Sequence, residues 1–397
     1  LPKCKSRPLR VVRVIDRLNI GGPAQHALLL TKEMSERGYR TVLAKGSISV
    51  GEAEMADVIA KTGVCVEEIS GLGRAVSPLA DLKAFVGLYR LIRRVRPHLV
   101  HTHKSKAGVL GRLAAVFAGA PVMVHTFHGN VFQRYFSSWK SALIRTVERL
   151  LAHLTDAVVT VTGQQRRELL AYRIAPHTRL HAVPLGLYLE PFLSGTGSGS
   201  GLRGELGFDA SCKMVGLVGR LVPIKGVEVF LEAAKRVSTE LADVRFVVVG
   251  DGELRADLET LARRLGIEEI VVFTGFRRDT PRIYDALDLL VLSSFNEGLP
   301  VALIEGIASG CYVVSSRVGG VTDLVDSDET GLIVVPGDAA VLASAIVDSL
   351  KEERRVPDAI RRRVGQHYGA NRLVTDLDHL YRELLHSKLG RQAGAPI

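Results

Sequence analysis

Two cations stand five positions apart in one loop of the second half of the chain. Arg220 and Lys225 lie in the run GRLVPIKG, after the apolar segment 214–218 and before residues 227–238, which have helical spacing. A guanidinium gives a two-pronged donor and an ammonium a mobile point charge, so the pair suits a diphosphate. A position between a strand end and a helix start also favours an anion. For either cation alone, a surface charge is the simpler interpretation.

Two carboxylates follow in the run SSFNEGLPVALIE, eight positions apart. Glu297 precedes Gly298, which lets the backbone approach a ligand closely, and Pro300 is tolerated in a first helical turn. The loop should therefore end in exposed N–H donors. Glu305 falls in an apolar helical stretch, where a buried carboxylate needs partners. The two hydroxyls of a ribose would satisfy it, and hydrogen bonds within the protein are the alternative.

Strand-like and helix-like segments alternate in both halves of the chain. The first series begins with an apolar β-rich run at 9–15, a break at Gly21-Gly22 and a helical pattern that stops at Gly38; a second series begins at 214–218. This alternation predicts an α/β protein with two doubly wound parallel sheets, each covered on both faces. Ligands of such folds bind beyond the carboxyl ends of the strands, so the loops there are where chemistry is expected.

The composition changes abruptly between the two halves, in the run SGTGSGSG. We interpret this run as a flexible surface linker. We expect one Rossmann-like domain over 1–190, a second over 205–368, and a C-terminal helix in 369–397 that packs back on the first domain.

The charge is distributed unevenly along the 397 residues. Residues 1–192 carry 28 Lys and Arg against 13 Asp and Glu, whereas the remainder carries 24 against 29. A basic half predicts an anionic partner, either a membrane surface or a phosphorylated lipid. Segments 88–96 and 140–149, with Lys104 and Lys106, are the candidates, and solvated helix faces are the alternative. No pattern of nucleic-acid recognition is present.

Cysteine spacing and hydropathy help to predict the cellular compartment of the protein. The four cysteines form no paired or metal-binding pattern, and no run of about 18 apolar residues occurs. We expect neither a signal peptide nor a membrane span. The expected location is the cytoplasm, with peripheral attachment to the inner membrane face as a further expectation.

These motifs occur together in one known family. The chain resembles the GT-B fold glycosyltransferases, specifically the retaining enzymes of family 4. The resemblance covers nearly the whole chain, in the right order, and rests on the E-x7-E pair Glu297 and Glu305, the cations Arg220 and Lys225, the glycine loop Gly21-Gly22, His128-Gly129, and residues 184–186, 250–254, 274–276 and 319–321.

The resemblance implies a fold and a reaction. Two Rossmann-like domains would face each other across a cleft, with 1–190 as the acceptor-binding domain and 205–368 as the nucleotide-sugar-binding domain. The enzyme would move a hexose or an N-acetylhexosamine, with retention, from a nucleotide diphosphate sugar to a saccharide or lipid-linked acceptor, as in cell-surface polysaccharide or glycolipid synthesis. UDP is the preferred nucleotide and GDP the second choice. Neither a metal nor another cofactor is expected, because fixed cations can stabilise the leaving diphosphate.

The resemblance also implies roles for the matched residues. Arg220 and Lys225 would bind the diphosphate, Glu297 the transferred sugar and Glu305 the ribose, while the backbone around Phe276 would border the base. Amides near the helix start would add contacts to the sugar, at Gly298, Leu299, Pro300 and Val301.

In the first half, Gly21 and Gly22 would let the loop approach the donor phosphates and the acceptor. His128 would lie near the sugar carbon under attack, as a positioning donor rather than a general base. His125 fits a core histidine held by hydrogen bonds.

Three other classes of protein compete with this interpretation. A UDP-sugar 2-epimerase of the same fold would convert the donor without an acceptor. A non-catalytic nucleotide-sugar-binding protein is disfavoured, since the cations and both glutamates are present. A nicotinamide dehydrogenase needs G-x-G-x-x-G after an early strand, and residues 20–24 do not supply it.

Overall fold

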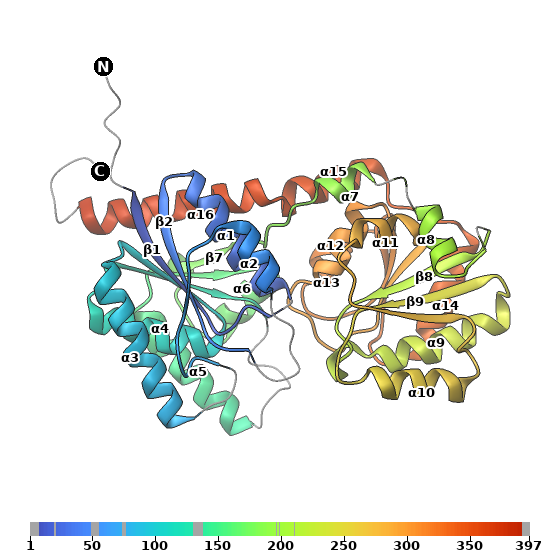
Figure 1. Ribbon diagram of the computed structural model, residues 1–397, viewed down its shortest axis with the longest axis horizontal. Helices are drawn as coiled ribbons and strands as arrows, with labels where there is room; N and C mark the ends of the chain where they lie inside the picture. Colours follow the sequence, from blue (N-terminus) through green and yellow to red (C-terminus); the bar gives the residue numbers. More distant parts are fainter. Residues whose placement is uncertain are drawn as a thin grey trace, which may run out of the picture. The chain divides into compact units, whose positions relative to one another are not determined.

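The computed structural model divides into two compact units (Figure 1). It describes residues 8–19, 21–48, 55–73, 77–129, 138–195, 197, 199–209 and 211–390, with only the backbone at 56–58, 138–140 and 200. Unit 1 comprises Leu1–Leu187 and Ala370–Ile397, and unit 2 comprises Tyr188–Gly369. The chain therefore returns to its first unit at its C-terminal end.

Unit 1 is built on a parallel seven-stranded sheet in the order β3-β2-β1-β4-β5-β6-β7. Its strands are β1 (Leu9–Ile15), β2 (Tyr39–Lys45), β3 (Val66–Glu68), β4 (Leu99–His103), β5 (Val122–Phe127), β6 (Ala157–Thr160) and β7 (Leu180–Ala182). Its helices are α1 (Gly22–Glu36), α2 (Ala56–Thr62), α3 (Pro78–Val95), α4 (Ser105–Ala118), α5 (Ser138–His153), α6 (Gly163–Ala171), η1 (His177–Arg179), α16 (Ala370–Leu385) and η3 (His386–Gly390).

Helices cover both faces of this sheet, α1 and α16 on one side and α3, α4 and α5 on the other (Figure 1). Side chains alternate accordingly along β1: Val11 packs with α1 and α16, whereas Val12 and Val14 pack with α3 and α4. Arg13 points to the first face, where it donates to Thr31 of α1 and to Tyr381 of α16. The C-terminal helix is thereby bonded to the central strand of unit 1.

Unit 2 holds a parallel six-stranded sheet in the order β10-β9-β8-β11-β12-β13. Its strands are β8 (Lys213–Val218), β9 (Val244–Val249), β10 (Val271–Gly275), β11 (Leu289–Leu292), β12 (Tyr312–Ser316) and β13 (Gly331–Val334). Its helices are α7 (Glu190–Ser194), α8 (Gly199–Glu205), η2 (Pro223–Lys225), α9 (Val227–Glu240), α10 (Arg255–Leu265), α11 (Thr280–Ala286), α12 (Val301–Ala308), α13 (Val321–Leu324), α14 (Ala339–Lys351) and α15 (Asp358–Tyr368).

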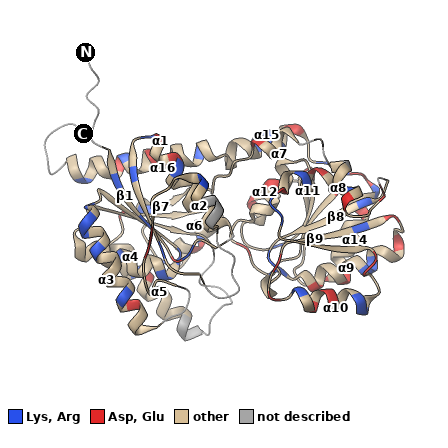
Figure 2. Ribbon diagram, in the orientation of Figure 1, with Lys and Arg blue, Asp and Glu red and all other residues tan. Residues whose placement is uncertain are grey.

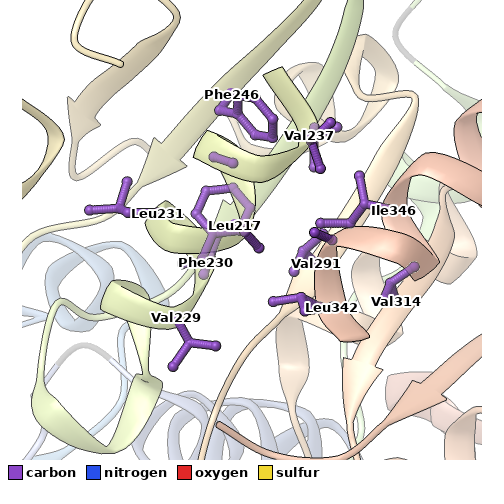
Figure 3. Close-up of a cluster of buried hydrophobic side chains, with 14 of the residues drawn as sticks. Leu217, Val229, Phe230, Leu231, Val237, Phe246, Val291, Val314, Leu342 and Ile346 are labelled. Carbon is purple, nitrogen blue, oxygen red and sulfur yellow. The ribbon is translucent and has the colours of Figure 1, made fainter. Parts of the chain in front are cut away.

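The larger core of unit 2 lies between its sheet and helices α9, α10 and α14 (Figure 3). Phe230 of α9 and Phe246 of β9 meet edge to face with ring centroids 5.8 Å apart, and Ile346 of α14 packs beside them. These side chains are fully buried. A core of this kind fixes the strands, and with them the loops at the strand ends.

The two predicted parallel α/β sheets are confirmed, but the end of the glycine and serine run, 194–201, is helical where a flexible linker is predicted. Helix α7 ends at the first residue of the run, Ser194, and α8 begins within it at Gly199; residues 196 and 198 are outside the described part. A Cβ atom at Gly199 would lie 2.7 Å from the carbonyl oxygen of Asp285. Arg203 of α8 also bonds Asp288 at 2.7 Å. Here glycine permits close packing rather than flexibility.

The basic surface of unit 1 differs from the prediction in one respect. Figure 2 shows Lys and Arg along α3, but the apolar residues beside them at Leu88, Leu91 and Ile92 are buried in the core. Segment 88–96 therefore presents cations without an apolar face. Lys104 and Lys106 form ion pairs with Asp16 and Asp81, at 2.9 and 2.5 Å.

Candidate functional site

The predicted donor-binding residues of unit 2 come together at one edge of its sheet. Strand order reverses between β8 and β11, and the loops after these two strands carry Arg220, Lys225 and Glu297. The loops are bonded to each other, since the amide of Phe295 donates to the carbonyl of Ile224 at 2.8 Å. Such a switch point is where open α/β sheets bind their ligands.

An ion pair joins the two loops. Lys225 Nζ lies 2.6 Å from Glu297 Oε1, and both side chains are largely shielded from solvent. The hydroxyl of Ser294 donates to the same carboxylate oxygen, at 2.7 Å. The carboxylate is thus held in place by two partners, and the side chain of Lys225 keeps 19% of its surface exposed. The pair presents one charge of each sign: the ammonium can bind a phosphate, and the carboxylate can accept hydrogen bonds from sugar hydroxyls.

Glycines allow the surrounding loops to approach closely. Gly226 has φ +57°, and a Cβ atom there would lie 2.5 Å from the carbonyl oxygen of Ser293. Gly319 has φ +48°, and its Cβ would lie 1.8 Å from the carbonyl oxygen of Glu297. Both positions combine left-handed backbone with backbone contact, so any side chain would push the Glu297 loop away.

Arg220 and Phe276 project further into solvent than the ion pair. Arg220 is exposed, and within the described ranges its side chain has no hydrogen bond or ion pair. Phe276 follows β10 and is 49% exposed. An uncommitted guanidinium after β8 and an exposed aromatic ring after β10, two strands away in the same parallel sheet, are free to meet a ligand.

Helix α12 begins directly after the Glu297 loop. Pro300 is its N-cap residue and accepts from the amides of Leu303 and Ile304. Leu299 and Pro300 are buried, whereas Gly298 and Val301 are partly exposed. The first amides of a helix have no partner within the helix, and they carry its positive dipole end. The helix start therefore offers donors beside Glu297.

Glu305 lies on the same helix with one hydrogen-bonding partner, the hydroxyl of Tyr284 at 3.1 Å. Burial raises the pKa of Glu305 to about 7, because the bond from Tyr284 offsets only part of the lost hydration. Of the two alternatives for Glu305, the structure shows the hydrogen bond within the protein, and the predicted contact with a ribose stays a prediction.

We expect Glu305→Gln to stabilise the ligand-free protein at pH 8. The raised pKa means that the folded state binds a proton more tightly than the unfolded state, so ionisation costs stability as pH rises from about 4.5 to 7. Removing the charge should increase the free energy of unfolding by about 3 kcal/mol at pH 8 and by almost nothing at pH 4.5. Urea unfolding at both pH values measures this, with the exposed Glu269→Gln as control. An equal change at both pH values would contradict the assignment.

In unit 1, the predicted glycine loop precedes α1. Gly21 caps this helix with extended backbone, and a Cβ atom there would have no neighbour within 4 Å. The protein itself therefore does not require glycine at 21. The role predicted for Gly21 and Gly22, to admit a ligand, is compatible with this open space and stays a prediction.

His128 follows β5 and belongs to a group of buried histidines. Its Nε2 lies 2.9 Å from Nδ1 of His103, the last residue of β4. Burial, reinforced by the charges of His26 and Lys104, holds the pKa of His128 well below its usual range. The ring is therefore neutral at pH 7, with one nitrogen engaged. His125, three residues before His128, is a core histidine as predicted. It is fully buried, and its Nδ1 lies 2.8 Å from the hydroxyl of Thr102.

Sequence reasoning missed Ser294, Tyr284 and the histidines around His128. Ser294 stands three positions before Glu297, a spacing that could have been noticed. Tyr284 could not, because its contact with Glu305 depends on how α11 packs against α12. His101 and His103 are two apart on one strand, so they share a face, and that signal was available.

Comparison with known families matches both units. The family model described as "Glycosyl transferase 4-like domain" matches residues 21–186, and that described as "Glycosyl transferases group 1" matches residues 212–352. The matched ranges contain every predicted site residue.

Two relatives extend the comparison. The chain is 31% identical to the UDP-Gal:alpha-D-GlcNAc-diphosphoundecaprenol alpha-1,3-galactosyltransferase of Escherichia coli, over 70% of this chain and 72% of that protein. It is 27% identical to the 2-deoxystreptamine N-acetyl-D-glucosaminyltransferase of Streptomyces fradiae, over 94% of each.

Solved structures share the fold. The Anabaena protein HepE, in complex with UDP and glucose, has a TM-score of 0.80 at 19% identity and covers 94% of this chain and 100% of its own. The sucrose-phosphate synthase of Thermosynechococcus elongatus has a TM-score of 0.79 at 20% identity, over 96% of this chain and 100% of its own.

Proposed function

Since the chain belongs to the GT-B fold glycosyltransferases that combine a glycosyl transferase 4-like domain with a group 1 domain, and so uses nucleotide-sugar donors, we propose the following reaction. The enzyme moves a hexose or an N-acetylhexosamine from a UDP-sugar to a saccharide or lipid-linked acceptor, with retention and without a metal. The observation that carries the proposal is the Lys225–Glu297 pair beside the uncommitted Arg220.

The roles of the unit 2 residues follow from their chemistry. Arg220 and Lys225 bind the diphosphate and stabilise the charge that grows on it as the bond to the sugar breaks. Glu297 accepts hydrogen bonds from the sugar hydroxyls, and the amides at the start of α12 donate hydrogen bonds to them. Glu305 accepts from the ribose, and Phe276 borders the base. Two fixed cations can supply the electrostatic stabilisation that a metal gives in other transferases.

Transfer with retention needs no separate base in this proposal. The bond from the anomeric carbon to the diphosphate oxygen breaks, and the acceptor oxygen bonds to that carbon on the same face. The acceptor proton passes to the departing diphosphate oxygen. His128, neutral and held by His103, serves as a positioning group for this step.

The names of the relatives support the choice of UDP and of a lipid-linked acceptor. The Escherichia coli relative uses UDP-galactose and an acceptor with a sugar on a lipid diphosphate, as its name states. GDP-sugars are the second donor class to test. The GT-B 2-epimerase and the non-catalytic binder remain the alternatives.

A transfer assay separates these alternatives. The protein is incubated with UDP-galactose, UDP-glucose and UDP-N-acetylglucosamine, each with and without N-acetylglucosamine linked through diphosphate to a lipid. We expect UDP release that depends on the acceptor, and a product whose anomeric configuration by NMR equals that of the donor. Conversion of the donor without acceptor would indicate an epimerase, and saturable binding without turnover would indicate a binder.

We further propose peripheral contact between unit 1 and anionic membranes. None of the helices in the described ranges is long and apolar enough to cross a membrane. Exposed apolar side chains nevertheless occur on the helices that cover one face of the sheet, at Leu79 and Leu82 of α3 and at Leu143 and Leu150 of α5. Together with the cations of α3, such residues favour an anionic interface.

The double substitution Leu143→Glu with Leu150→Glu should weaken this contact. Two apolar groups would be lost and two charges would be repelled by the anionic surface, so we expect at least a tenfold fall in partitioning. Co-sedimentation with phosphatidylglycerol vesicles measures it, and Val341→Glu, at an exposed apolar position of unit 2, is the control. If the parent protein, the double variant and Val341→Glu partitioned equally onto the vesicles, this face of unit 1 would be excluded as the membrane-binding surface.

A further inference from the structure

Three histidine side chains of unit 1 converge at one point. His26 comes from α1, His103 ends β4, and His128 follows β5. One ring nitrogen of each lies within 4.8 Å of the others. We propose that these three residues form a binding site for a divalent transition-metal ion of the zinc class.

The sheet explains why residues so distant in sequence meet. β4 and β5 are parallel neighbours, with His103 opposite Thr126, so His128 lies just beyond the same edge. β1 pairs with β4 on its other side, and the helix that follows β1 carries His26. All three side chains are thus fixed by the switch point of unit 1, and a rigid scaffold of this kind suits a metal site.

The polar atoms of the three rings are incompletely satisfied. His26 is 2% exposed, and neither of its ring nitrogens has a hydrogen-bond partner in the described part of the chain. His103 is fully buried, and its Nε2 likewise has no partner there. A buried polar atom without a partner costs about 1–3 kcal/mol, so these nitrogens are unusual for a core. A bound ion would satisfy them.

The spacing of the rings fits tetrahedral ligation. The ring centroids lie 5.0 Å apart for His26 and His128, 5.2 Å for His103 and His128, and 5.7 Å for His26 and His103. With metal to nitrogen distances of about 2.0–2.1 Å, a tetrahedral ion in line with each ring places the centroids about 5 Å apart. Metal binding would replace the His103–His128 hydrogen bond by two metal bonds.

The donor set indicates which ions bind. Three imidazoles suit Zn²⁺, Co²⁺, Ni²⁺ and Cu²⁺, whereas Mg²⁺ and Ca²⁺ need oxygen ligands. These ions bind the neutral form of imidazole, through the lone pair of its unprotonated nitrogen. The buried guanidinium of Arg13 opposes a cation, and an anionic fourth ligand such as hydroxide would compensate for this charge.

Such a site would differ from the proposed catalytic machinery of unit 2, which uses cations of the protein. If the proposed function holds, occupancy would engage His128 and Zn²⁺ would inhibit transfer reversibly. Binding itself does not depend on that function, so a failure of one is distinguishable from a failure of the other.

The test is titration of the full chain, freed of metal with a chelator, with Co²⁺ and Zn²⁺ alone. We expect one equivalent of Co²⁺ to give the intense visible absorption of a four-coordinate site, displaced by Zn²⁺, and calorimetry to give one Zn²⁺ per chain. His26→Ala should weaken Zn²⁺ binding at least tenfold, whereas His177→Ala, at an exposed histidine of the same unit, should not.

Circular dichroism confirms that each variant is folded, and His103→Gln provides a second variant if His26→Ala is not. Weak binding without the four-coordinate spectrum, or binding that both cluster variants retain, would overturn the proposal.

Discussion

Replacing Lys225 by methionine should lower kcat by about 100- to 1,000-fold, the usual effect of removing one group that stabilises developing negative charge. The physical reason is that the ammonium, 2.6 Å from Glu297, is positioned by the loop itself rather than by a ligand. It therefore needs little reorganisation when charge develops on the leaving diphosphate. Steady-state kinetics with a UDP-sugar and its acceptor measure the effect, and KM for the donor should change less than kcat.

Two further variants test whether the loss of rate comes from the charge of Lys225. Lys225→Arg keeps the charge and should recover part of the rate. Lys213→Met removes another lysine of unit 2, which pairs with Glu353 on the surface, and should leave kcat unchanged. A kcat for Lys225→Met within threefold of the parent value would exclude Lys225 from the chemical step.

Unit 1 should lose stability steeply below pH 6.5. Among the described residues of unit 1, burial lowers the pKa of seven histidines, slightly at His98 and His181 and strongly at five others: His26, at about 3, and His101, His103, His125 and His128. The unfolded chain binds protons at these positions below pH 6.5, whereas the folded chain does not. Stability is therefore complete above that pH and falls as the pH decreases toward the folded pKa values.

The expected loss is about 1.4 kcal/mol for each of the five strongly shifted histidines between pH 7.5 and 5.5, and about 7 kcal/mol for the five together. Hydrogen exchange of the β1, β4 and β5 amides measures the stability of unit 1 directly. His26→Gln should reduce the pH slope by about one proton, while His177→Gln, at an exposed position, should not change it. Constant protection between pH 7.5 and 5.5 would show that these rings are not neutral in the fold.

The two units thus respond oppositely to pH. Glu305 of unit 2 favours the folded state more as pH falls from about 7, whereas the histidines of unit 1 favour it less. Both effects arise from the burial of ionisable side chains, which disfavours their charged forms.

Much of the fold was predictable from local pattern. The strand at 9–15 and the strand at 214–218 were expected from apolar β-rich runs and coincide with β1 and β8. Periodicity could not reveal that α8 begins in the glycine-rich run, because its formation depends on contacts with α11. Glycine composition indicates flexibility only when nothing packs against it, and at Gly199 the backbone of Asp285 does.

The part of the candidate site that lies in loops directly after strands was predictable. Arg220, Lys225 and Glu297 follow β8 and β11, and the parallel sheet brings these strand ends together. Contacts between distant elements were not predictable. The bond from Tyr381 of α16 to His101 of β4 spans most of the chain and depends on the return of α16 to unit 1.

The most direct test of the central claim is a crystal structure of the full chain with UDP. The account predicts the diphosphate within hydrogen-bond distance of both Arg220 and Lys225, and the ribose hydroxyls on Glu305. UDP bound elsewhere, or a diphosphate that contacts neither cation at saturating nucleotide, would contradict it.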